Sequence, residues 1–313
     1  MASAPIADLT YRGYDGPLAA PGFRWWVIAQ ASMKMSIKKK GFWVWSVLSA
    51  YWYAVLAVFF YFASELGPPA KPGQIPPLFA NIVWKDQFLD AFSFGQLMFF
   101  IVALLIGAGS IANDNRANAL LVYLSKPCTK LDYIIGKWVG IFIPLTLVVG
   151  APMLMFYGYC LLSYRDYGFV SQDPWLILKL LCVIPLPGIF HASVVLGISS
   201  LFNQGRMAGA TYAGLYFLTN FATKIMQIIR LQAGSETPAL VDNLFYCSID
   251  GIQIGLAKLI LGTNGSPLFQ QRARGISLPP APNGPVFFAL FFIVCAGSIW
   301  VAWKRIRAVE VVG

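Results

Sequence analysis

The residues of this chain with the most potential for chemistry gather in one polar stretch, 113–137, which separates two long apolar runs. It contains acids and bases, among them Asp114, Arg116 and Lys137. The whole chain has one histidine, His191, and no Cys-x-x-Cys pair, so it cannot build a His-based metal site. A lone histidine is also too little for a catalytic constellation, and we expect it to be hydrogen-bonded between helices. The chemistry of the polar stretch is therefore charged docking, because so short a loop with its own helical pattern is typical of a contact segment.

Composition assigns the chain to the integral membrane proteins, because 58% of its 313 residues are hydrophobic and only 12% are charged. Strands of a membrane barrel would be about ten residues long with alternating polarity, which these runs are not. We therefore predict an all-α polytopic membrane protein. Six runs are long enough to cross a hydrocarbon layer of about 30 Å: Phe42–Phe62, Ala91–Ala112, Tyr133–Tyr164, Leu180–Phe202, Met207–Ile229 and Pro285–Trp303. None of the six contains Asp or Glu, which argues against a proton-coupled transporter.

The distribution of Lys and Arg predicts the orientation. With the N-terminus in the cytoplasm, 14 of the 23 basic residues lie on the inner side, and the outer side is nearly neutral. Both termini are then cytoplasmic, in a multi-pass protein of the plasma (cytoplasmic) membrane. The net charge of +10 is thus explained by topology, without nucleic-acid binding.

Residues 1–41 form the predicted cytoplasmic N-terminus, in which 23–40 have the pattern of an amphipathic interfacial helix. Its basic face carries Lys34 and Lys38, which suit anionic lipid headgroups, and Trp26 belongs to an adjoining apolar stripe. A plain positively charged anchor beside the first span explains the lysines equally well.

The six-span domain, 42–303, is interrupted outside the membrane by residues 231–284 and is followed by a basic cytoplasmic tail, 304–313. Within the outer segment, 244–261 is apolar but contains Asp250 and Lys258, so we expect it to dip into the outer leaflet without crossing. As a seventh span it would place the basic tail outside, against the charge rule.

The inner segment 113–130 has a helical pattern of its own. Ala117, Leu120, Leu121 and Leu124 recur at one helical face, and Pro127 ends the helix at Lys126. Periodicity alone leaves two alternatives open: the stripe packs against the protein's own spans, or it docks to a partner.

A resemblance favours the partner. The run Asp114-x3-Asn118-Ala119-Leu120-x3-Leu124-Ser125-Lys126-Pro127-Cys128-Thr129-Lys130-x2-Tyr133-x2-Gly136-Lys137 resembles the signature of type-2 ABC exporter permeases. The basic, valine-containing ending 303–310 and the order of spans resemble that family too. Departures exist: the family's usual Glu is Asp114, its Gly-Thr is Asn118-Ala119, and an Arg is replaced by Lys130, which keeps the charge but loses the bidentate fork.

The resemblance implies a permease subunit, forming half of a translocation pathway, whose 114–127 helix couples to a cytoplasmic ATPase dimer. The coupling residues are then Asp114, Arg116, Asn118, Leu120, Leu121, Leu124, Ser125, Lys126 and Pro127. The chain lacks a G-x4-G-K-[ST] run, so it is not an enzyme by itself, and ATP and Mg²⁺ would be bound by the partner subunit. The alternative is a non-transporting membrane scaffold.

A stripe of small residues suggests a second permease half, identical or paralogous. Gly205, Gly209 and Ala213 recur every four residues, with Gly214 beside them. Small side chains let helices approach closely in lipid, and the resemblance implies a dimer with this fifth span near the pathway.

Overall fold

The computed structural model describes residues 23–67, 76–117, 119, 128–233, 244, 246–265 and 281–306. Within them every regular element is a helix, which confirms the all-α prediction for that part. The helices are α1 (Arg24–Ile37), α2 (Lys40–Ser49), α3 (Tyr51–Leu66), α4 (Pro77–Ala80), α5 (Trp84–Gly107), α6 (Ala112–Arg116), α8 (Lys130–Ser163), the short 3₁₀ helix η1 (Arg165–Tyr167), α9 (Phe169–Gln172), α10 (Leu176–Val183), α11 (Pro185–Ser199), α12 (Gly205–Ala233), α14 (Ile249–Leu261) and α15 (Gly284–Arg305).

Five helical stretches in the described part are long and apolar enough to cross a membrane: Lys40–Leu66, Trp84–Arg116, Lys130–Ser163, Leu176–Ser199 and Gly284–Arg305. The fifth predicted span, Met207–Ile229, corresponds to α12, a helix of 29 residues. It is not among the five, because polar residues such as Thr219, Asn220 and Lys224 dilute its apolar ones.

The second stretch begins at Trp84, seven residues before the predicted run, which starts at Ala91. This additional beginning contains two acids, Asp86 and Asp90. Both acids have partners: the Trp52 indole N–H donates to Asp90 at 2.9 Å, and the Thr263 hydroxyl donates to Asp86. An acid can lie in this stretch because another element supplies the donor that water would otherwise supply.

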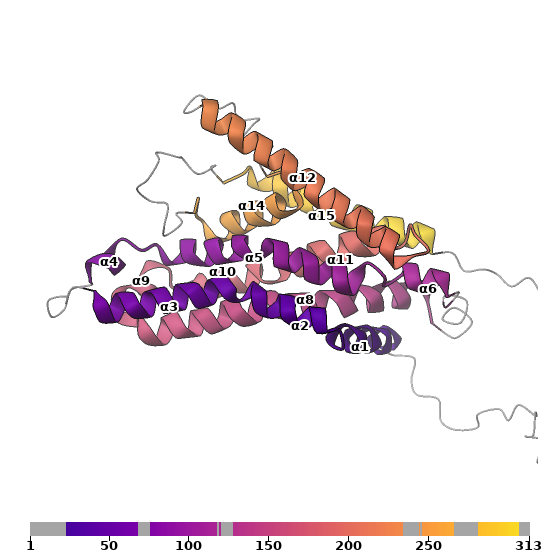
Figure 1. Ribbon diagram of the computed structural model, residues 1–313, viewed down its shortest axis with the longest axis horizontal. Helices are drawn as coiled ribbons and strands as arrows, with labels where there is room; N and C mark the ends of the chain where they lie inside the picture. The colour runs from indigo at the N-terminus through magenta and orange to yellow at the C-terminus, as the bar shows by residue number, and fades with distance from the viewer. Residues whose placement is uncertain are drawn as a thin grey trace, which may run out of the picture.

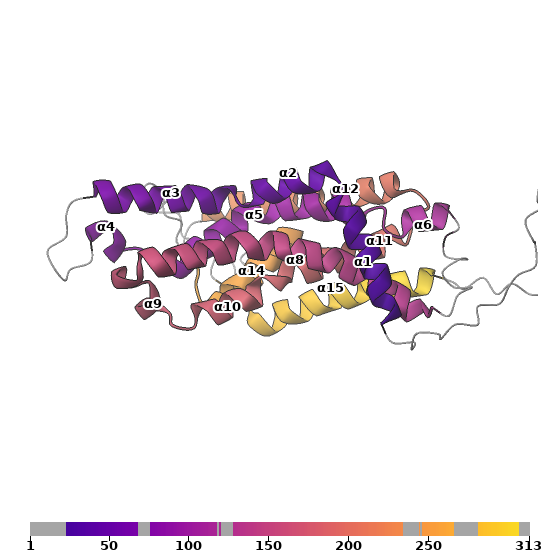
Figure 2. The same cartoon turned by 90° about the horizontal axis from the view of Figure 1, so that it is seen from below.

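The helices form an elongated bundle, with α5, α8 and α11 packed together at its centre (Figures 1 and 2). The helix α2 packs along α5, and α15 packs along α11. The two ends of the bundle differ. At one end, called here the α6 end, lie α6, α1 and the last turn of α15; α4 and α9 lie at the other, the α4 end. The helix α12 crosses the bundle diagonally and diverges from it toward the α4 end (Figure 1).

The helix α1 lies across the bundle at the α6 end, seen nearly end-on in Figure 1 and crossing α8 in Figure 2. Two glycines of α8 allow this crossing. A Cβ on Gly136 would lie 2.6 Å from the Trp25 carbonyl oxygen, and one on Gly140 would lie 2.5 Å from the Ser32 Cβ. On Gly158, farther along the same helix, a Cβ would meet nothing within 4 Å. Close approach of α1 therefore requires glycine at the first two positions only.

The predicted faces of the interfacial helix are partly reassigned. Trp26, Lys34 and Lys38 are exposed, whereas the buried face against α8 is centred on Ile28 and Ala29. Trp26 is therefore on the outward side with the lysines. The helix thus has one side packed on protein and another side that is exposed.

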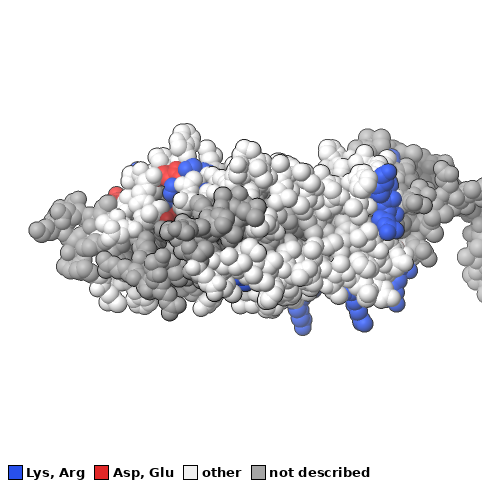
Figure 3. All heavy atoms as spheres, turned by 90° about the horizontal axis from the view of Figure 1, so that it is seen from above, with Lys and Arg blue, Asp and Glu red and all other residues white. Residues whose placement is uncertain are grey.

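On the face drawn in Figure 3, most Lys and Arg side chains lie toward the α6 end, whereas the acidic side chains lie toward the α4 end, with some basic side chains beside them. The described basic residues at the α6 end include Arg24, Lys34, Lys38, Lys39, Lys40, Arg116, Lys130, Lys304 and Arg305. This asymmetry agrees with the sequence expectation that one side is strongly basic.

Candidate functional site

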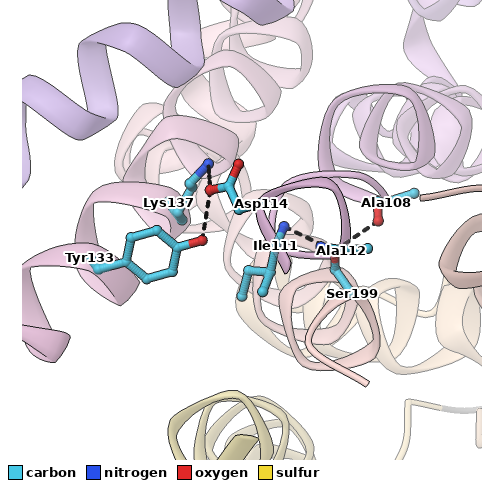
Figure 4. Close-up of polar contacts among 7 residues, drawn as sticks. All are labelled: Ala108, Ile111, Ala112, Asp114, Tyr133, Lys137 and Ser199. Atoms are coloured by element: carbon cyan, nitrogen blue, oxygen red, sulfur yellow. Dashed lines mark hydrogen bonds and ion pairs between the residues drawn. The ribbon is translucent and has the colours of Figure 1, made fainter. Parts of the chain in front are cut away.

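The predicted coupling segment begins in α6, the part of it that the structure describes. A break after the end of α5 separates α5 from α6. Residues 108–111 form a turn between the two helices, and the Ser199 hydroxyl at the end of α11 lies inside it. This hydroxyl accepts hydrogen bonds from the backbone N–H groups of Ile111 (3.1 Å) and Ala112 (3.0 Å) and donates to the Ala108 carbonyl (2.8 Å) (Figure 4). It thereby meets the hydrogen-bonding needs that the helix break creates, with its one proton and both lone pairs engaged.

An ion pair joins α6 to α8. The Asp114 carboxylate lies 2.7 Å from the Lys137 ammonium and accepts a hydrogen bond of 2.8 Å from the Tyr133 hydroxyl (Figure 4). The side chain of Lys137 is 5% exposed and that of Asp114 is 20% exposed. Tyr133 and Lys137 are four residues apart and so share one face of α8. Poor access to water strengthens this pair and makes it costly to break.

Two asparagines connect α6 to the start of α12. The Asn115 amide donates to the Phe202 carbonyl at 3.2 Å, and the Gly205 N–H donates to the Asn113 side chain at 3.3 Å. A Cβ on Gly205 would lie 2.9 Å from the Asn113 Oδ1, so this approach depends on glycine. The turn between α11 and α12 is therefore held against α6.

The surrounding helix ends are also fixed. Thr129 caps α8 directly after the segment, because its hydroxyl accepts from the Asp132 N–H (3.1 Å) and Asp132 accepts from the Thr129 N–H (3.0 Å). Lys130 lies over the Trp303 ring of α15 at 4.6 Å. The Lys39 ammonium donates to the Leu105 carbonyl near the end of α5 (2.6 Å), and burial lowers the pKa of Lys39.

The structure locates only part of the predicted site. Asp114 faces its own α8, and Arg116 is exposed. The other predicted coupling residues, Asn118, Leu120, Leu121, Leu124, Ser125, Lys126 and Pro127, lie outside the described residues. Sequence reasoning missed Ser199, Asn113 and Asn115 as positioning residues. Ser199 ends an apolar run and gives no local signal, whereas the two asparagines stood in the polar stretch beside Asp114.

The small-residue stripe of α12 is divided between two environments. Gly205 packs on Asn113 and Gly109, and a Cβ on Gly209 would make ordinary contacts with Ala108 and Leu104 of α5. These two positions therefore face the same subunit. Gly214 is exposed, with nothing within 4 Å of an added Cβ, and Ala213 is half-buried.

The model of one protein family, described as "ABC-2 family transporter protein", matches residues 26–272. The match starts within α1 and extends beyond α14, so it includes α6 and the residues of α8, α11 and α12 that contact it. None of the curated proteins matches the chain.

We predict that Lys137→Met destabilises the purified chain by roughly 2–4 kcal/mol, because it leaves a mostly buried carboxylate unpaired. Combining it with Asp114→Asn removes the charge and should recover most of that loss. Lys40→Met, at an exposed lysine of the same end, should change stability by no more than about 0.5 kcal/mol. Denaturant unfolding in detergent measures all three, and equal losses in the single and double variants would contradict a coupled pair.

Proposed function

The chain belongs to the ABC-2 transporter family, and from this premise we propose that it is the membrane-spanning permease subunit of an ATP-driven exporter, working with a separate cytoplasmic ATPase. The observation that carries the proposal is the anchoring of α6. The residues that open the segment 113–130 are bound to α8 through Asp114 and to the start of α12 through Asn113, and Ala112, directly before them, is bound to Ser199 of α11. A segment that only connected two spans would not need three anchors.

In the proposed mechanism, ATP and Mg²⁺ bind the partner ATPase, and closure of its two subunits displaces the coupling segment of each permease. A short, well-anchored helix transmits such a displacement as a rigid body. The contacts of Asp114, Ser199 and Asn113 would pass the displacement both to α8 and to the turn between α11 and α12. Leu120, Leu121 and Leu124 would supply the docking area, and Arg116 and Lys126 would fix its orientation.

A second part of the proposal is the topology. We infer six spans, with α12 as the fifth, and both termini in the cytoplasm at the α6 end. The basic residues at that end support this orientation. A spanning α12 is supported by its length, since 29 residues extend about 43 Å, more than a hydrocarbon layer of about 30 Å requires.

Cysteines introduced at the exposed positions Thr129, Ser171 and Gln232 test this topology, after the native cysteines have been replaced. We expect an impermeant thiol reagent applied outside intact cells to label the cysteines at 171 and 232, and to label the cysteine at 129 only after permeabilisation. Labelling of the cysteine at 232 only after permeabilisation would show that α12 does not cross.

The docking role predicts that Leu121→Asp with Leu124→Asp abolishes copurification of the ATPase, since an unpaired carboxylate buried at an interface costs several kcal/mol. Val122→Asp is the matched control, because residue 122 lies off the predicted stripe and should retain the ATPase. If the doubly substituted chain copurifies its ATPase at the wild-type yield, the stripe faces the chain's own spans.

We further propose that two permease halves associate through the exposed side of α12. Met207, Gly214, Leu218 and Phe221 on this side are exposed and have the spacing of one helical face. Gly214 would let a second helix approach closely.

A cysteine at Gly214, in a chain without the native cysteines, should therefore cross-link to a second permease half, identical or paralogous. A cysteine at Ile293, which is 68% exposed on α15, is the control and should give no such product. Equal yields at both positions would indicate random collision, and absence of product at Gly214 and Leu218 in a complex that holds its ATPase would place the interface elsewhere.

A further inference from the structure

The helix α14 brings polar side chains against α11 and α12 inside the bundle. The Nδ1 of His191 lies 2.5 Å from the Tyr212 hydroxyl, and its Nε2 lies 3.2 Å from the Gln253 amide. All three side chains are completely buried. His191 is thus a hydrogen-bonded histidine between helices, as the sequence predicted, and these contacts account for both of its nitrogens.

Asp250, three residues before Gln253 on α14, is less well satisfied. The Tyr216 hydroxyl donates to Asp250 Oδ2 at 2.6 Å, whereas Oδ1 is buried and has no hydrogen-bond partner within the described part of the chain. Tyr216 is the twelfth residue of α12, about 16 Å along the helix, so in a six-span topology this carboxyl lies near mid-membrane. An ionised carboxylate with a free oxygen is costly at such a depth, and a protonated one is not.

The contacts of α12 change at Tyr216. Ala208, Tyr212 and Tyr216 are buried against the bundle, but none of the described α12 side chains beyond Tyr216 is. The same side of the helix continues with half-buried polar residues, Thr219, Asn220 and Thr223. A short polar strip, formed by these three side chains, therefore lies next to Tyr216 on the part of α12 that diverges from the bundle.

Opposing influences act on the charge of Asp250. A buried carboxyl oxygen without a partner favours the neutral form, whereas the hydrogen bond from the Tyr216 hydroxyl favours the ionised form. The exposed Lys224 ammonium lies about two turns beyond Tyr216 on the same helix. The other titratable groups on α5 and α10, and the cysteine of α15, are engaged elsewhere or uncharged. On α5, Lys85 and Asp86 contact the residues after the opposite end of α14, and Asp90 is bonded to Trp52. On α10, Lys179 pairs with Asp173 at 2.5 Å; Cys182 is exposed there, and Cys295 of α15 is buried.

We propose that Asp250 is a proton-binding site whose protonation controls the seating of α12 on α14. The proton comes from water along the polar strip and returns to it. With the proton bound, the neutral carboxyl stays buried and α12 remains seated. After the proton leaves, the contact between α12 and α14 opens. The carboxylate is then hydrated and can interact with the Lys224 ammonium. This goes beyond the proposed function, and it removes the sequence argument against proton linkage, which rested on an apparent absence of acids in the membrane.

Infrared difference spectroscopy of the full-length chain in lipid nanodiscs tests the site between about pH 5 and about pH 9, without an ATPase. An ordinary aspartate, with a pKa of about 3.9, is ionised throughout this range. We expect a protonated-carboxyl carbonyl band that disappears as the pH rises. The band should be absent in Asp250→Asn and present in the control Asp90→Asn. A band that persists in Asp250→Asn, or no titrating band in the wild type, would overturn the proposal.

A variant that keeps the acid gives a second readout. Tyr216→Phe removes a donor to the ionised form, so the midpoint should move to higher pH by about one to two units. Spin labels on the native Cys247 and on Ile225→Cys, both exposed positions in a background without the other cysteines, should separate as the pH rises. That separation should be independent of pH in Asp250→Asn; an unchanged pH response there would refute control of α12 by this carboxyl.

Discussion

The ion pair between Asp114 and Lys137 is the interaction on which the α6 end of this protein depends. A helix that stops before a polar segment leaves backbone groups without partners, and in an apolar surrounding each one is costly. The Ser199 hydroxyl supplies partners at the break itself. The ion pair then fixes the first turn of the segment to α8, the longest described helix. Without a charged anchor, the direction in which the segment leaves the bundle would be poorly determined.

The two halves of α12 are attached in different ways. Its first half is seated by Gly205 against α6 and by buried tyrosines, whereas no described side chain beyond Tyr216 is buried. Packing in a membrane depends on close contacts and internal hydrogen bonds, because lipid covers an apolar surface as well as protein does. The first half is therefore determined by the chain itself. The second half depends on whatever lies against it, whether lipid, water or another subunit.

Local sequence patterns predicted much of the fold, because long apolar runs can satisfy their backbone only as helices. The contacts that hold α6 to the neighbouring helices were predicted less completely. The resemblance pointed to Asp114, Tyr133, Gly136 and Lys137, but not to the ion pair and hydrogen bond that Asp114 makes with Lys137 and Tyr133. Ser199 and Asp250 could not be found in this way, since their partners are about 90 and 34 residues away in the sequence. The helix α5 extends farther than the predicted apolar run, because Asp86 and Asp90 receive hydrogen bonds from donors on other elements, which the local sequence does not show.

The helix α6 is held by several contacts, whereas the second half of α12 has few. This difference determines which part of the protein moves when α6 is displaced. Asp114 obliges α8 to follow α6, because breaking its contact leaves a mostly buried ion pair unmatched, and the hydrogen bond to Asn113 links the start of α12 to the same helix. Closely packed cores resist deformation, so a displacement is accommodated in the regions that have the fewest contacts. On α12 those contacts lie beyond Tyr216, and the last polar one described on its bundle side is the hydrogen bond to Asp250. The carboxyl of Asp250 is therefore placed where a small change in charge can have the largest effect on the position of the helix.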